Sequence, residues 1–184
     1  MRSKKFWIFL AILAVILIAV FFYLNFRSRG LSPLDEESLT SGGVTVTVEY
    51  SRPSARGRLI FGPEDQEALQ PFGKYWRLGA NEATEITFNR DVLFNGSPVK
   101  AGSYSMYAIP GPNSFEIVLN TEIDRSGSNP PKEENDALRT KVQTQSASSP
   151  VEQFTISLAP QGEGMAMVFE WSDTRFVVPI RAAE

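Results

Sequence analysis

Beyond residue 43 the chain alternates apolar and polar side chains at every second position. In the first such segment, apolar side chains occupy alternate positions from Val44 to Tyr50. A period of two is typical of a strand that buries one face. The segments with this pattern are 44–50, 85–89, 103–108, 115–119, 154–158, 165–171 and 176–180, and residues 138–144 could add one more. Turn sequences such as Asn95-Gly96 and Ser172-Asp173 separate them. We therefore predict an all-β fold, an antiparallel β-sandwich of about seven or eight strands.

The N-terminal part of the chain has a different pattern, because residues 6–26 form an almost uninterrupted apolar run. A helix of this length spans the hydrocarbon core of a bilayer. Trp7 and Tyr23 lie near its two ends, where amphipathic aromatic side chains are common. A cleaved signal peptide has a shorter apolar stretch and small residues at the cleavage site, whereas bulky side chains fill Phe21 to Leu24. We predict a single-pass transmembrane helix that is kept as a signal anchor.

Basic side chains on either side of this run predict its orientation. Arg2, Lys4 and Lys5 precede the run, and Arg27 and Arg29 follow it. This small excess predicts that residues 1–5 are a cytoplasmic stub and that the rest of the chain is extracytoplasmic, either periplasmic or extracellular.

Two segments are predicted to be irregular. Residues 27–42 are polar, contain Gly and Pro and have no apolar period, which favours a flexible tether before a domain over 43–184. Much of 121–150 is rich in Ser, Asn, Pro and charge, which favours a long surface loop.

Composition removes many functions. The 184 residues include no Cys and no His, so thiol nucleophiles, His general bases, disulfides and Cys/His zinc sites are excluded. The net charge of -3 gives no basic surface of the kind that binds nucleic acid. We expect no metal, no cofactor and no nucleic-acid partner, and these exclusions favour a non-enzymatic protein over an enzyme.

The strongest candidate site lies in an irregular region that combines charged and aromatic side chains with several glycines. Its members are Arg52, Arg58, Trp76, Arg77, Asn81, Glu82 and Glu85. Arginine forks beside an aromatic ring and an amide can hold a carboxylate, a phosphate or a sugar. We expect the arginines to meet anionic groups and Trp76 to form an apolar wall.

Two other interpretations of these residues stay open. In a purely structural one, Arg52 or Arg77 pairs with Glu82 or Glu85, and Trp76 fills the core between two sheets. In an enzymatic one, Glu82 and Glu85 are the carboxylate pair of an envelope glycan hydrolase. A spacing of three residues on a turn does not establish the opposed geometry that such a reaction needs.

Several motifs of the domain resemble those of the family of domains of unknown function numbered 2911. The matching segments are 50–54, 57–58, 60–62, 71–77, 79–86, 101–104 and 109–110, and the most specific run is Arg-x-Gly-Ala-Asn-Glu-Ala-Thr at 77–84. The resemblance extends over roughly 43–181 and implies an exported bacterial domain without implying a reaction. The chain departs from the family in lacking a Trp-Gly pair soon after residue 120 and in keeping a long apolar run.

Together these observations predict a membrane-anchored domain that acts as a binding or interaction module at the cell envelope. Its expected partners are the membrane, through residues 6–26, and an anionic or sugar-like envelope ligand or a protein. A hydrolase, or a structural interaction domain without a small ligand, are the alternatives.

Overall fold

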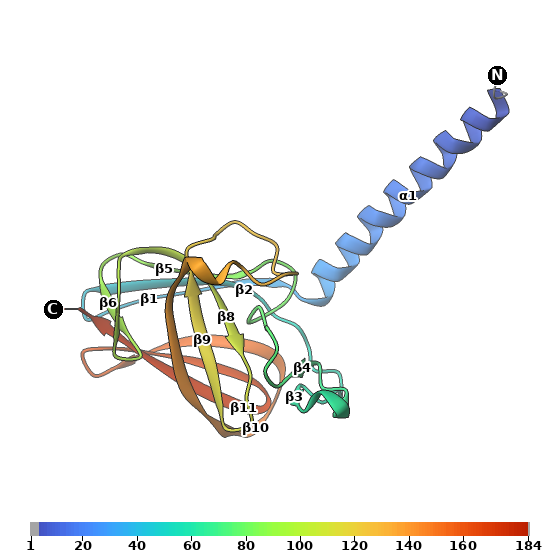
Figure 1. Cartoon of the computed structure of the whole chain (residues 1–184). Helices are drawn as coiled ribbons and strands as arrows, with labels where there is room; N and C mark the ends of the chain where they lie inside the picture. Colours follow the sequence, from blue (N-terminus) through green and yellow to red (C-terminus); the bar gives the residue numbers. More distant parts are fainter. Residues whose placement is uncertain (1–3, 184) are drawn as a thin grey trace.

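The computed structural model describes residues 4–183, which form one long helix and a mostly β domain (Figure 1). The elements are α1 (Lys4–Leu31), β1 (Leu34–Ser41), β2 (Val44–Ser51), β3 (Phe61–Gly62), η1 (Glu64–Gln66), β4 (Gln70–Pro71), β5 (Thr84–Phe88), β6 (Val92–Phe94), β7 (Ser97–Val99), β8 (Gly102–Ile109), β9 (Ser114–Asn120), η2 (Glu133–Asn135), β10 (Asp136–Gln161) and β11 (Gly164–Ala182). Nine strands form an antiparallel sheet in the order β1-β2-β5-β8-β9-β10-β11-β6-β7, and β3 pairs in parallel with β4.

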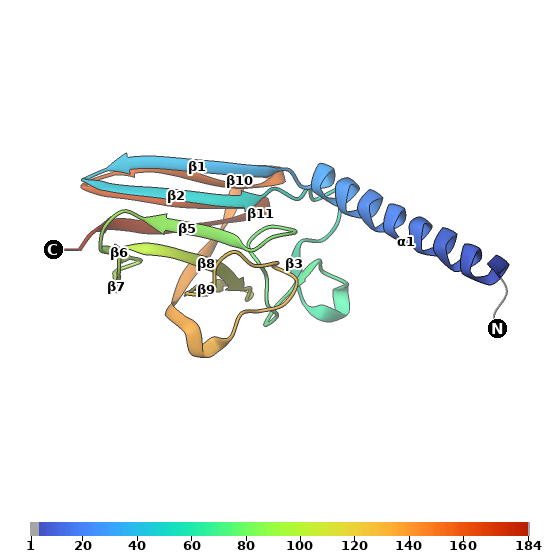
Figure 2. The same ribbon diagram turned by 90° about the horizontal axis from the view of Figure 1, so that it is seen from above.

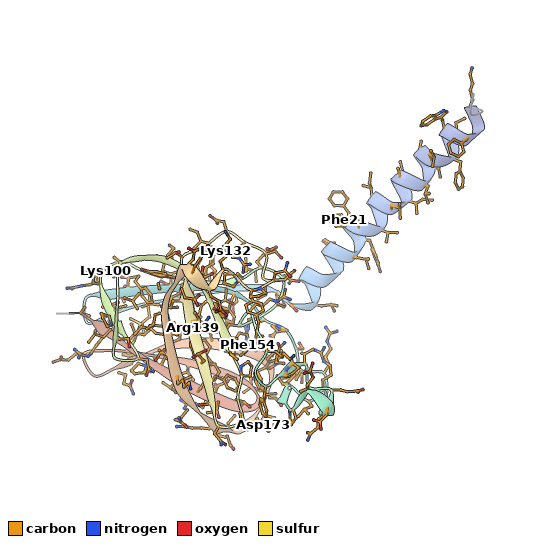
Figure 3. The ribbon with its side chains drawn as sticks, in the orientation of Figure 1. Phe21, Lys100, Lys132, Arg139, Phe154 and Asp173 are labelled. Carbon is orange, nitrogen blue, oxygen red and sulfur yellow. The ribbon has the colours of Figure 1, made fainter. Side chains whose placement is uncertain are left out.

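Helix α1 contains the predicted apolar run and projects away from the sheet (Figures 1 and 2). Its stretch Phe6–Leu24 of 19 residues is long and apolar enough to cross a membrane, and none of it is buried against the domain. Phe21, labelled in Figure 3, is 63% exposed on this helix. Such a helix is consistent with a signal sequence or a membrane anchor.

The alternation of side chains is confirmed, and it builds the core. In β2, Val44, Val46, Val48 and Tyr50 are all buried, as predicted. The alternate apolar positions of β5, β8, β9 and β11 are buried in the same way. One face of the sheet therefore packs inward around a single hydrophobic core.

The last two strands are much longer than the sequence predicts. β10 begins at Asp136, so the second half of the expected loop 121–150 is strand, and β11 continues through the expected Ser172-Asp173 turn. Both strands bend at one place, where Val151 pairs with Ser172 between two register shifts. Ser172 has a φ of 54°, and the strands continue on both sides of it with shifted register, as at a bulge. Ser172-Asp173, which the sequence predicts to be a turn between strands, therefore lies at a bend within β11.

This bend curls the sheet, so that one continuous sheet stands where the sequence predicts two separate ones. The C-terminal half of β10 lies beside the end of β2. There the Tyr50 hydroxyl donates to the carbonyl of Ile156 (3.0 Å) and accepts from its amide (2.9 Å). Ser54 and Gln153 form an isolated antiparallel bridge next to these contacts. The curl is not closed, and β1 and β7 are the two edges of the sheet within residues 4–183.

The predicted tether over 27–42 is wrong, because α1 continues to Leu31 and β1 pairs with β2 along its full length. β1 alternates exposed and half-buried side chains, and polar pairs such as Ser38–Thr47 link it to β2. It therefore lacks the apolar period by which strands are predicted. Gly42 and Gly43, with φ of 57° and 76°, form the tight turn that joins the two strands.

Arg52 holds β1 and β10 at the end of β2. Its guanidinium pairs with Asp35 (3.0 Å) and donates to the Phe154 carbonyl (3.2 Å) and the Thr155 hydroxyl (2.9 Å). Its backbone amide donates to Pro33 (2.9 Å), in the short link between α1 and β1. Arg52 is thus a structural residue that joins three strands.

We expect Arg52→Ala to lower the free energy of unfolding by about 1.5 kcal/mol, because hydrogen bonds to charged groups contribute about 1.5–3 kcal/mol and this side chain is partly exposed. Chemical denaturation of the full chain in detergent measures the change. The matched control is Arg90→Ala, which removes an exposed arginine at the end of β5. Equal stability of the Arg52 and Arg90 variants would contradict the structural role.

Candidate functional site

The structure does not bring the seven predicted site residues together: five line two different clefts, and the other two lie outside both. Arg52 is structural, and Trp76 lies in the core. Arg58, Arg77 and Asn81 line one cleft, which we call the arginine cleft. Glu82 and Glu85 line a second one, which we call the acidic cleft.

Trp76 is only 2% exposed and belongs to a cluster of aromatic rings. Its indole stacks on that of Trp171, with ring centroids 5.8 Å apart and an angle of 23° between the planes. Phe61 and Phe154 contact it edge-on at 5.0 and 5.1 Å; Figure 3 labels Phe154, which is fully buried. Trp171, its stacking partner, is the tryptophan that lines the arginine cleft.

The arginine cleft has a volume of about 340 Å³ and no acidic residue in its lining. Its walls are Ser32, Pro53, Arg58, Leu69, Gln70, Arg77, Gly79, Ala80, Asn81 and Trp171. Arg58 donates to the carbonyls of Ser54 (2.7 Å) and Ala55 (3.0 Å) in its own loop. Arg77 donates through Nη1 to the Asn81 carbonyl (3.0 Å). Neither arginine forms an ion pair with a carboxylate among residues 4–183, so the positive charge of the cleft is not neutralised there.

A tight turn between Trp76 and β5 places these side chains. Leu78 and Asn81 have φ of 52° and 60°, and Gly79 has 154°. A Cβ atom on Gly79 would lie 2.7 Å from the carbonyl oxygen of Ser51, so only glycine permits this approach to β2. The turn sets Asn81 against the chain that leaves α1, where its amide donates to Ser32 (3.4 Å).

The acidic cleft is lined in part by the residues that follow this turn, Glu82 and Ala83, and has a volume of about 200 Å³. Its walls are Leu34, Glu49, Tyr50, Ser51, Glu82, Ala83, Glu85, Asp124 and Arg125. Glu85 accepts a hydrogen bond from the Asp124 amide (2.6 Å) and lies directly opposite Glu49 on β2. Burial raises the pKa of Glu85, and the negative charges of Asp124 and Glu49 raise it further.

A small groove of about 190 Å³ shares lining residues with both clefts, and we call it the connecting groove. It is lined by Ser32, Leu34, Ser51, Asn81 and Glu82. Ser32 and Asn81 also line the arginine cleft, whereas Leu34, Ser51 and Glu82 also line the acidic cleft. Each of the three hollows is therefore lined by Ser32 or Leu34, which follow the end of α1. Figure 1 shows α1 leaving the domain at this end of the sheet.

The loop that follows β9 completes the site and was not predicted to do so. Its Arg125 carbonyl accepts from Ala83 (3.1 Å), and Gly127 donates to the Asn81 carbonyl (3.0 Å). A Cβ atom on Gly127 would lie 2.6 Å from Cδ of Arg77, so the loop packs closely on that side chain. The sequence of this loop, which is polar and without period, carries no signal for the contact.

These features define a β-rich domain with a polar, charge-divided site, preceded by an apolar helix. The chain belongs to the family described as "Protein of unknown function (DUF2911)", which matches residues 32–180. The resemblance seen in the motifs is thus confirmed, and the matched region begins before β1. No curated protein and no solved structure matches the chain.

We expect Glu85→Gln to raise the melting temperature near neutral pH. Because burial raises the pKa of this carboxyl, its ionised form is less stable in the fold than in the unfolded chain. The resulting loss of stability is absent at low pH and grows as the pH rises from the ordinary pKa of glutamate through the raised one. Glutamine keeps the acceptor for the Asp124 amide without the charge.

Differential scanning calorimetry of the full chain between about pH 3 and pH 8 measures this difference. The matched control is Glu163→Gln in the exposed turn between β10 and β11. An advantage of Glu85→Gln that is largest at low pH would contradict the assigned cause.

Proposed function

We propose that the protein is a membrane-anchored extracytoplasmic binding domain whose arginine cleft recognises an anionic ligand. The observation that carries the proposal is a cleft with two guanidinium groups and no carboxylate in its walls. Its volume of about 340 Å³ lies within the usual range for small-molecule sites. Arginine forks bind carboxylates and phosphates in a bidentate manner, which gives both energy and orientation.

The anchor and its orientation form the second part of the proposal. The apolar stretch Phe6–Leu24 would span about 28 Å, close to the thickness of the hydrocarbon core. The basic residues before it favour a cytoplasmic N-terminus. Because Ser32 and Pro33 are the only residues between α1 and β1, the domain would stand close to the membrane surface.

Cysteine labelling tests this topology, since the chain has no Cys of its own. In spheroplasts of a bacterial host we expect a membrane-impermeant maleimide to label Asp173→Cys, which is exposed on β11 (Figure 3). We expect Ser3→Cys to react only after the membrane is permeabilised. The opposite labelling pattern would contradict the orientation. A membrane-bound or released protein that has lost the N-terminal segment with the Ser3→Cys substitution would contradict a retained anchor.

For the binding site, we expect an anion from a panel of organic acids, phosphates and acidic envelope sugars to raise the melting temperature of the full chain in detergent. A ligand at one hundred times its dissociation constant stabilises the fold by about 2.7 kcal/mol. Arg77→Gln should abolish the shift, because it removes the guanidinium from the cleft. Arg90→Gln, an exposed arginine remote from the cleft, is the matched control.

A shift that survives in a folded Arg77→Gln variant would reject the arginine cleft as the site. The absence of any shift across the panel would favour the structural interpretation, in which the domain binds a protein through another surface.

A glycan hydrolase is the second candidate, supported by the raised pKa of Glu85 in a cleft that Glu82 also lines. The Glu85→Gln variant also tests this candidate, because turnover of an envelope glycan that is unchanged in that variant would remove it.

A further inference from the structure

The two clefts differ in the charge of their walls, and each shares lining residues with the connecting groove. We propose that the site binds a short zwitterionic peptide, with its carboxylate in the arginine cleft and its ammonium group in the acidic cleft. This inference rests on the proposed function and adds the chemical class of the ligand and the role of the acidic cleft.

The separation of charge is the first support. The arginine cleft holds Arg58 and Arg77 and no acidic side chain, whereas four carboxylates line the acidic cleft beside a single arginine. The guanidinium of that arginine, Arg125, also contacts two residues that do not line the cleft. Its Nη2 donates to the Asn129 carbonyl (2.8 Å), and its Nε lies 3.7 Å from Glu122. A ligand with one charge sign would suit only one half of the site.

Continuity is the second support, since the connecting groove shares residues with both clefts. Asn81 borders the arginine cleft, and the next residue, Glu82, borders the acidic cleft. The Cα atoms of consecutive residues are about 3.8 Å apart. The walls of the two clefts therefore meet within one peptide unit of the chain, and we expect a ligand of two or three residues to occupy both.

The walls of the site also offer groups that suit the uncharged part of a peptide. Trp171 lines the arginine cleft, is 1% exposed, and its Nε1 donor has no partner within the described chain. A buried polar group without a partner is costly, so an acceptor such as a peptide carbonyl would stabilise it. Leu34 borders both the acidic cleft and the connecting groove, where it offers apolar surface to a side chain.

The state of Glu85 is consistent with an ammonium partner. Its neighbours Glu49 and Asp124 are both negative, and together with burial they disfavour its ionised form. An ammonium group would place a positive charge beside these carboxylates and favour the ionised form of Glu85. A free anion such as phosphate, in contrast, would leave the acidic cleft unused.

Four peptides separate the contributions of the two ends: trialanine, N-acetyl-trialanine, trialanine amide and N-acetyl-trialanine amide. Their affinities are measured by isothermal titration calorimetry on the full chain in nanodiscs of phosphatidylcholine. We expect trialanine to bind, and each single cap to weaken binding by at least about tenfold, because each removes a charge-assisted hydrogen bond.

Variants assign each end of the peptide to a cleft. In Arg77→Gln we expect trialanine and trialanine amide to bind alike, while the preference for a free amine is kept. In Glu85→Gln we expect the reverse, with trialanine and N-acetyl-trialanine binding alike. Arg90→Gln, outside the site, should keep both preferences, and circular dichroism checks that each variant is folded.

Equal affinity of trialanine and N-acetyl-trialanine for the unmodified chain would overturn the inference and leave the proposed anion site in place. Failure of all four peptides to bind would also overturn it, and the proposed function would then depend on the panel of anions alone. Preferences that persist in both folded variants would place the peptide outside these clefts and overturn the inference as well.

Discussion

The stack of Trp76 on Trp171 is the contact on which the site depends. Two contacts fix the position of Trp76. Its backbone pairs with Ala108 on β8 through two hydrogen bonds of 2.8 Å, and its ring packs on Trp171 of β11. Aromatic pairs contribute about 0.5–1.5 kcal/mol each beyond the burial of their area. The irregular chain between β4 and β5 is therefore fixed at one point inside the curl of the sheet. Arg77 follows immediately and must emerge at the edge of the core, where the arginine cleft lies.

The bend shared by β10 and β11 supplies the other half of this arrangement. It brings the inner part of β10 against the end of β2, where Tyr50 and Arg52 bind its backbone. The loop after β2 is then held across the end of the sheet, and it carries Arg58 to the cleft. The same bend places Trp171 one residue before the bulge at Ser172. The packing of the core and the position of the site thus have a common cause.

The sequence could predict the parts of the fold that bury a regular face. The strands with alternating apolar residues and the apolar helix are present, and the irregular region around Trp76 does contain clefts. β1 was missed because its own sequence is mostly polar and has no apolar period. The length of β10 was missed because Pro150 and the serines before it are typical of a loop. The division of the site into two clefts could not be predicted, because it arises from contacts between residues far apart in the chain, such as Gly127 with Arg77. The sequence alone does not show whether a charged side chain binds other parts of the protein, as Arg52 does, or lines a cleft.

Two groups of charged residues in the same domain illustrate this difference. On the outer side of β8, β9 and β10, Arg139 (Figure 3) pairs with Asp136 (2.7 Å) and Glu116 (3.1 Å), so its charge is compensated by carboxylates. At the site, Arg77 is satisfied by the Asn81 carbonyl and Glu85 by the Asp124 amide, which are neutral groups. Hydrogen bonds to neutral backbone groups hold these side chains in place without cancelling their charges. The charge of each cleft is therefore not cancelled by these contacts, which is the basis for proposing a ligand that carries both signs.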